Sequence, residues 1–144
     1  MIQKGQFIQS TSLLVGTIFE DSKILICDVN EKGAWGFIMN KPFPRKLNEL
    51  VEFNHCPAFP LWNGGPVENE KLFFIHQRPD LIEDGTHIFD NYYWSGNFQQ
   101  AIQHIIANTI NEHELKLFIG YCGWDDTQLQ EEIKEGSWEI VDFS

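Results

Sequence analysis

Two apolar segments joined by a very short connection place the strongest constraint on the fold. Residues 22–29, SKILICDV, form an apolar run rich in β-branched side chains, and residues 34–39, AWGFIM, form a second one. Such runs are typical of buried strands. The connection is too short for the crossover that a parallel pair needs, so the two strands are expected to form an antiparallel hairpin.

Apolar periodicity predicts the other elements. Further strands are expected at 71–76, 86–94, 115–121 and 137–142. Helical spacing predicts a short helix at 47–53, a longer one at 97–110 capped by Asn97 with Gln100 at its third position, and one at 126–135 capped by Asp125 with Gln128 at its third position. Helices that are few and unevenly placed beside antiparallel hairpins favour an α+β class, in a compact single domain over residues 1–144 with two to four flanking helices.

The charge of the chain narrows the possible partners. The net charge is −11, and it is uneven: residues 1–72 carry seven Lys or Arg against eight Asp or Glu, whereas residues 73–144 carry three against thirteen. The one local basic group is Lys41, Arg45 and Lys46. An acidic chain repels phosphate backbones, so direct nucleic-acid binding is not expected. No apolar run approaches the roughly 18 residues of a membrane span, so no membrane partner is expected either.

Cysteine usage and the start of the chain predict a cytoplasmic location. Cys27, Cys56 and Cys122 are odd in number and widely spaced, which argues against a disulfide framework. The first residues, MIQKGQF, lack the apolar region of a secretory signal.

The chain offers few candidates for catalysis or metal binding. His55 and Cys56 are the one adjacent base and nucleophile, but neighbouring side chains usually diverge, so a loop histidine beside a half-buried thiol is the better interpretation. The remaining histidines have no partner at ligand spacing, and no metal or cofactor is expected. The carboxylates of 125–126 and of Glu131, Glu132 and Glu135 are best explained by a helix start and an outward helix face.

A glycine pair before a proline is more informative. In Trp62-Asn63-Gly64-Gly65-Pro66 the proline pushes Gly65 towards extended conformations, and Gly64 is free to adopt a positive φ. No phosphate-loop pattern accompanies the pair. Two interpretations stay open: a tight turn, or a loop whose open backbone N–H groups cradle a small ligand or a partner's peptide.

Three blocks resemble the AlgH/YqgE family of bacterial proteins. They are GAWGFIMNKP at 33–42, GGPV at 64–67, and GYCGW at 120–124 followed by Gln128-Leu129, Glu132 and Gly136-Ser137-Trp138. The resemblance implies a compact α+β fold with a barrel-like sheet. It also implies a link to transcriptional regulation, with no catalytic residue or cofactor. Glu20-Asp21 stands where relatives are often basic, which weakens a nucleic-acid role for this chain.

If the three blocks meet in space, they line a glycine- and tryptophan-rich concavity. Its candidate ligand-binding residues are Asn40, Gly64, Gly65, Trp124 and Gln128. The same residues would equally build a glycine-rich sheet corner with Trp124 in the core. The leading functional hypothesis is a non-catalytic regulatory or binding protein, a transcriptional regulator that acts through contact with a protein partner. The alternative is a small-molecule sensor or enzyme that uses this concavity.

Overall fold

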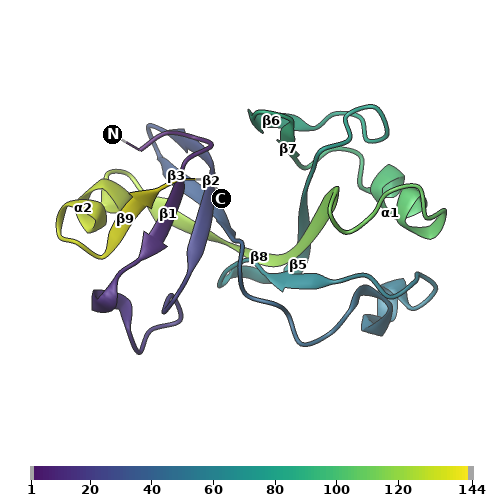
Figure 1. Cartoon of the computed structure of the whole chain (residues 1–144), viewed down its shortest axis with the longest axis horizontal. Helices are drawn as coiled ribbons and strands as arrows, with labels where there is room; N and C mark the ends of the chain where they lie inside the picture. Colours follow the sequence, from purple (N-terminus) through teal and green to yellow (C-terminus); the bar gives the residue numbers. More distant parts are fainter. Residues whose placement is uncertain (1, 143–144) are drawn as a thin grey trace.

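One long strand, β8 (Leu115–Asp125), runs through the middle of the protein and joins its two lobes, as the computed structural model of residues 2–142 shows (Figure 1). Its first half pairs antiparallel with β5 (Val67–His76) and parallel with β4 (Leu61–Asn63). Its second half pairs antiparallel with β3 (Gly33–Ile38). Because the neighbours of β8 change along its length, the strand belongs to both lobes.

The remaining elements complete a largely antiparallel sheet. The other strands are β1 (Phe7–Ser10), β2 (Lys23–Asn30), β6 (Thr86–Phe89), β7 (Tyr92–Trp94) and β9 (Trp138–Val141). The helices are α1 (Phe98–Ile106) and α2 (Gln128–Lys134), with 3-10 turns η1 (Ser12–Leu14), η2 (Leu47–Glu49) and η3 (Val51–Phe53). Along the sheet the strand order is β6-β7-β5-β8-β3-β2-β1-β9.

The expected α+β class and the first hairpin are confirmed. β2 and β3 pair antiparallel, with Leu25 opposite Phe37 and Asn30 opposite Gly33. The barrel-like shape that the family resemblance implied is not reached, because β6 and β9 end the sheet without pairing with each other in the part of the chain described. The sheet is therefore open.

The helices are shorter than the apolar spacing predicted. Asn97 caps α1 by accepting a hydrogen bond from the Gln100 backbone N–H, as expected, but the helix ends at Ile106. Asn108 then adopts a left-handed conformation, a common way for a helix to stop. α2 begins at Gln128 instead of 126, since Thr127 has a φ of +56° and lies outside the helical region.

Two further expectations need correction. The single strand predicted at 86–94 is a hairpin of β6 and β7, because Asp90 turns the chain with a φ of +46°. The short helix predicted at 47–53 is two consecutive 3-10 turns, η2 and η3.

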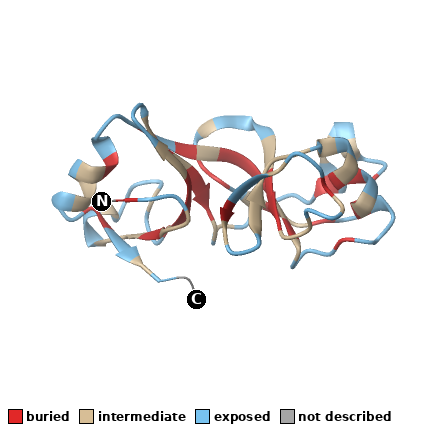
Figure 2. Ribbon diagram, turned by 90° about the horizontal axis from the view of Figure 1, so that it is seen from above, coloured by how far each residue is buried: buried red, intermediate tan, exposed pale blue. Residues whose placement is uncertain are grey.

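The core consists of three clusters that follow the two lobes and the region between them (Figure 2). One fills the lobe of α1, where Leu117 and Ala101 are fully buried. A second fills the lobe of α2 around Ile8 and Trp138. The third lies between them, where the rings of Phe37 and Phe118 stack with centroids 4.3 Å apart. Burial therefore continues from one lobe to the other.

A close passage of two backbone segments holds the middle of the sheet together. Gly64 and Gly65 cross β8 at Gly120, and we call these three residues the glycine crossing. A Cβ atom on Gly64 would collide with the carbonyl oxygen of Gly120, and one on Gly120 would collide with that of Gly65. The positive φ expected at Gly64 is found instead at Gly65, at +150°, and at Gly120, at +76°. Glycine is required here for space as well as for conformation.

In the lobe of α2, the carboxylate of Glu132 accepts hydrogen bonds from two indole N–H groups. Oε1 of Glu132 accepts hydrogen bonds from Nε1 of Trp124 and of Trp138, at 3.1 and 3.0 Å. Oε2 accepts one from the amide of Gln128 at 3.0 Å. Glu132 is thus half-buried and faces inward, contrary to the outward orientation expected for it. Trp124 is 7% exposed and belongs to the core, as its structural interpretation predicted.

The close packing at the glycine crossing predicts that Gly→Ala at Gly120 lowers the free energy of unfolding much more than Gly→Ala at Gly16. Gly16 has a φ of +84° with nothing near its missing Cβ, so Gly16→Ala should cost only the conformational strain of about 1–2 kcal/mol. Gly120→Ala adds the collision with the backbone and should cost more than about 4 kcal/mol or prevent folding. Urea denaturation of both variants measures this, and equal losses would show that the crossing is not tightly packed.

The hydrogen bonds of Glu132 to Trp124 and Trp138 predict that its substitution lowers the free energy of unfolding, whereas substitution of the adjacent Glu131 does not. Glu132→Ala leaves two largely buried indole N–H groups without their acceptor and should lower the free energy of unfolding by about 2–3 kcal/mol. Glu131→Ala, on the exposed side of the same helix, should change it by less than about 0.5 kcal/mol. Chemical denaturation compares them, and a Glu132→Ala loss as small as that of the control would contradict the role assigned to the carboxylate.

Candidate functional site

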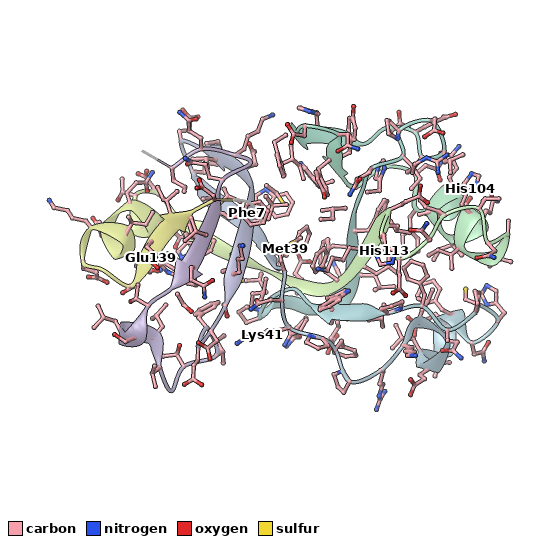
Figure 3. The ribbon with its side chains drawn as sticks, in the orientation of Figure 1. Phe7, Met39, Lys41, His104, His113 and Glu139 are labelled. Carbon is pink, nitrogen blue, oxygen red and sulfur yellow. The ribbon has the colours of Figure 1, made fainter. Side chains whose placement is uncertain are left out.

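A cavity between the two lobes, here called the central cleft, is the best candidate for a functional site. It is open to solvent on one side and has a volume of about 490 Å³, within the usual range of small-molecule sites. Residues of both lobes line it, among them Phe7, Met39, Asn40, Trp62, His113 and Lys116. In Figure 3 Phe7 and Met39 lie near the middle of the molecule and His113 lies on the other lobe, while His104 and Glu139 lie at opposite ends, away from the cleft.

Lys116 is the most unusual residue of the central cleft. It stands in β8 between the fully buried Leu115 and Leu117, and the alternation of the strand places its side chain on the opposite face. The ammonium group donates a hydrogen bond of 2.7 Å to the carbonyl oxygen of Met39 and lies 4.0 Å from the centre of the Trp62 ring. A cation over an indole face is attracted by the ring's quadrupole.

The environment of Lys116 weakens its amine as a base. Burial lowers the pKa of Lys116 to about 8 from the ordinary value of 10.5. Among the described residues no carboxylate forms a salt bridge with it. The neutral form of this amine is therefore more populated near pH 7 than that of an ordinary lysine.

The other charges of the central cleft are partly neutralised. The carboxylate of Glu114 forms a 2.8 Å salt bridge with Arg78, and the backbone N–H of Asn111, followed by Arg78, lowers its pKa. Lys23 lies 5.5 Å from the centre of the Phe7 ring. The lining thus carries two lysines, Lys23 and Lys116, and two glutamates, Glu112 and Glu114.

His76, which also lines the central cleft, is held as a neutral imidazole. Its Nδ1 accepts a hydrogen bond of 3.0 Å from the backbone N–H of Arg78, and its side chain is buried. Burial is the main cause that lowers the pKa of His76. The ring therefore contributes polarity to the cavity without charge at neutral pH.

Asn40 lies at the cleft, where both ends of its amide hold the backbone. Its Oδ1 accepts a 3.0 Å hydrogen bond from the N–H of Lys23, and its Nδ2 donates one of 2.8 Å to the carbonyl of Asp21. Through these two hydrogen bonds, Asn40 links the segment that follows β3 to the end of the β1–β2 connection. Of the five candidate residues, Asn40 is the one that lines the central cleft.

The backbone N–H groups of the glycine pair point into the protein. The N–H of Gly64 donates to the carbonyl of Ile119 at 2.8 Å, and that of Gly65 donates to the side chain of Asn63 at 3.3 Å. The open cradle considered from the sequence is therefore not formed. Gly65 lines a separate hollow of about 270 Å³ with Ile38 and other residues.

Trp124 and Gln128 lie in the lobe of α2, away from the central cleft. Gln128 is bound to Glu132 and to the backbone N–H of Asp125. Trp124 lines a third hollow of about 550 Å³ beside Trp35 and other aromatic rings. The three sequence blocks thus meet in the fold, but the five candidate residues do not share one concavity.

Lys116 is not among the candidate residues named from the sequence, although the sequence carries a signal for it. A single charged residue interrupts the apolar run LKLFI of β8, and a strand buried on both faces seldom carries one without a specific contact. Its contacts with Met39 and Trp62 join segments far apart in the chain, and spacing along the sequence cannot reveal such contacts.

The three cysteines and the possible metal ligands lie within the described residues 2–142. Cys27, Cys56 and Cys122 are buried and unpaired, and burial raises the pKa of each thiol, that of Cys122 to about 12. These thiols are therefore protonated at neutral pH. Within residues 2–142 no group of three or more His, Cys, Asp or Glu side chains is arranged to hold a metal ion. In the same part of the chain no helix is long and apolar enough to cross a membrane.

Comparison with solved structures finds the same fold in other proteins. The solution structure of the AlgH protein from Pseudomonas aeruginosa superimposes with a TM-score of 0.76 at 22% identity, covering 97% of this chain and 77% of that protein. The crystal structure of protein DIP2367 from Corynebacterium diphtheriae gives a TM-score of 0.79 at 17% identity, covering 100% and 78%. At these identities the likeness concerns the fold alone.

Comparison of sequences shows the family. A UPF0301 protein of Chlorobium limicola is 36% identical over 141 residues, covering 98% of this chain and 75% of the relative. A UPF0301 protein of Cytophaga hutchinsonii is 34% identical over 145 residues, covering 100% and 80%. The AlgH-like family model matches residues 7–144. The chain therefore belongs to the AlgH-like family, as its three sequence blocks indicated.

Proposed function

We propose that this chain is a regulatory binding protein whose central cleft takes a small molecule with a carbonyl or carboxylate oxygen. The observation that supports the proposal most strongly is Lys116, an amine that lines a 490 Å³ cavity and contacts Trp62 and the carbonyl of Met39. An N–H donor beside an aromatic wall fits a small planar ligand with an acceptor oxygen. The site thus differs from the concavity suggested by the sequence.

The connections of the cleft support a regulatory role. Asn40 lines the cleft and binds the backbone of Asp21, while the neighbouring Lys41 donates a 3.0 Å hydrogen bond to the carbonyl of Ile18. A ligand that moves the Asn40 segment would therefore act on the loop between β1 and β2. A ligand that favours one arrangement of this loop shifts the population towards it.

The same loop is the candidate surface for a protein partner. Leu13, Val15 and Ile18, here called the apolar loop, are 62%, 66% and 62% exposed. Large apolar side chains gathered in one exposed segment are typical of protein contacts. We propose that the protein influences transcription through such a contact in the cytoplasm, since its net charge of −11 disfavours DNA as the direct partner.

Ligand binding in the central cleft is testable by NMR titration. Pyruvate, acetate and benzoate serve as probes, added to uniformly ¹⁵N-labelled protein. Shifts should concentrate at the Trp62 indole and at the amides of Met39 and Lys116, whose groups line the cavity. Lys116→Gln should weaken the binding by roughly 10–100-fold, the effect of losing a charged hydrogen-bond donor.

A matched control and a clear contradiction accompany this titration. Lys134→Gln, on the exposed surface of α2, should leave the affinity unchanged. Shifts confined to the hollow beside Trp35 and Trp124, or binding that Lys116→Gln does not weaken, would contradict the assignment of the cleft.

The weakened base also predicts how stability depends on pH. The pKa of Lys116 is about 8 in the folded chain and 10.5 in its ordinary state, so between these values the unfolded chain binds more protons. The free energy of unfolding should therefore rise with pH in this window, by about 1–2 kcal/mol for a side chain that is only partly buried.

The comparison uses Lys116→Met, which removes this contribution. Buried thiols of Cys27 and Cys122 lower the stability of both proteins alike at high pH, so the difference between the two proteins isolates Lys116. Urea denaturation at pH 7 and pH 10 measures this difference. Between the two pH values, the free energy of unfolding of the wild type should fall less, or rise more, than that of the variant. Parallel changes would mean that Lys116 titrates normally.

A further inference from the structure

Lys116 has the geometry that an imine-forming lysine requires. Such an amine needs a fixed position on the wall of a cavity, where a carbonyl compound can approach it, and a setting that leaves it partly neutral. Lys116 Nζ is held by the carbonyl of Met39 at 2.7 Å and by the Trp62 ring at 4.0 Å. Beside it the central cleft offers about 490 Å³.

We propose that Lys116 forms a reversible imine with the carbonyl group of a small aldehyde or 2-oxo acid in the central cleft. The neutral amine attacks the carbonyl carbon, and the electron pair of the C=O bond moves to oxygen, which gives a carbinolamine after proton transfer. Loss of water then forms the C=N bond. The products are the imine and one water molecule, so no oxidant or reductant is needed.

The surroundings of Lys116 suit the protonated imine as well as they suit the ammonium group. A protonated imine carries one N–H and one positive charge. Within the described residues Met39 supplies the one protein acceptor that Nζ uses, and the Trp62 face attracts either cation. Among the described residues no carboxylate forms a salt bridge with Lys116, so no ion pair holds its amine in the protonated state.

The acid–base behaviour of the amine supports the same chemistry. Burial lowers the pKa of Lys116 from 10.5 to about 8, which increases the neutral fraction at pH 7 roughly 300-fold over an ordinary lysine. Neutral amine is the reacting species, so a larger neutral fraction favours attack, although the lower basicity of the amine offsets part of this gain.

This inference rests on the central cleft being the ligand site, and it deepens that proposal by naming the reactive group of the ligand. A 2-oxo acid would add a carboxylate to the carbonyl; Lys23 of the lining attracts that carboxylate, whereas Glu112 and Glu114 repel it. A neutral aldehyde would depend on the carbonyl alone. The two sources share the imine chemistry, and separate arms of the experiment distinguish them.

Reductive trapping tests the proposal on the whole 144-residue chain. The protein is incubated at pH 7 with sodium cyanoborohydride and either glyoxylate or propanal, and modified lysines are located by peptide mass spectrometry. Lys116 should be modified at least tenfold faster than every other lysine side chain. The α-amino group is scored separately because its ordinary pKa is about 8. A greater preference for Lys116 over the exposed lysines with glyoxylate than with propanal would identify an oxo acid as the preferred class, and equal preferences a neutral carbonyl.

Two variants and one pH comparison keep the test decisive. Lys116→Arg should abolish the fast modification, while Lys134→Arg should leave it unchanged, with thermal melts confirming that both fold. Raising the pH to 10 should reduce the advantage of Lys116, because the other lysines then become partly neutral as well. Modification spread evenly over the lysines at pH 7, or Lys116 among the slowest, overturns the imine proposal.

Failure of this proposal can be separated from failure of the ligand site. If carboxylates shift the Trp62 and Met39 resonances but no carbonyl compound is trapped on Lys116, the cleft binds ligands without covalent chemistry and the imine proposal is wrong. If neither occurs, both proposals are wrong. Selective trapping at Lys116 supports both.

Discussion

The glycine crossing is the constraint on which the rest of this structure depends. Gly64 and Gly65 pass so close to Gly120 that a side chain on any of them would strike the opposing backbone. The carbonyl of Gly64 accepts a hydrogen bond of 2.9 Å from Ile38, which fixes the end of β3 beside the same point. The crossing therefore brings together three segments that are distant in sequence, and it lets β8 pass from one lobe into the other.

The environment of Lys116 follows from that crossing. Trp62 lies two residues before Gly64, and Met39 directly follows Ile38, so the two groups that contact the ammonium are both carried by segments that the glycines position. Desolvation of an amine costs stability, and here a single carbonyl and a ring face offset only part of that cost. A costly group on the wall of a cavity is typical of functional sites, where stability is given up for chemistry.

Local patterns predicted the elements but not the site. The hairpin of β2 and β3 was predictable because so short a connection, two residues in the structure, permits only an antiparallel pair. The helix at 97–110 was predictable in type, whereas its early end depended on the left-handed conformation of Asn108. The glycine pair was correctly singled out, but its role is close backbone packing, which depends on Gly120, more than fifty residues away. The role of Lys116 could not be predicted for the same reason, because only the tertiary fold brings its partners, Met39 and Trp62, next to it.

The central claim is that the fold leaves Lys116 partly deprotonated near neutral pH. Its most direct test is an NMR titration of the chain labelled with ¹³C at the ε-carbon of lysine, with the Lys116→Arg variant used to assign the resonance. The Lys116 resonance should titrate with a midpoint of about 8, well below that of an ordinary lysine. A midpoint above 10, indistinguishable from the exposed lysines, would contradict it.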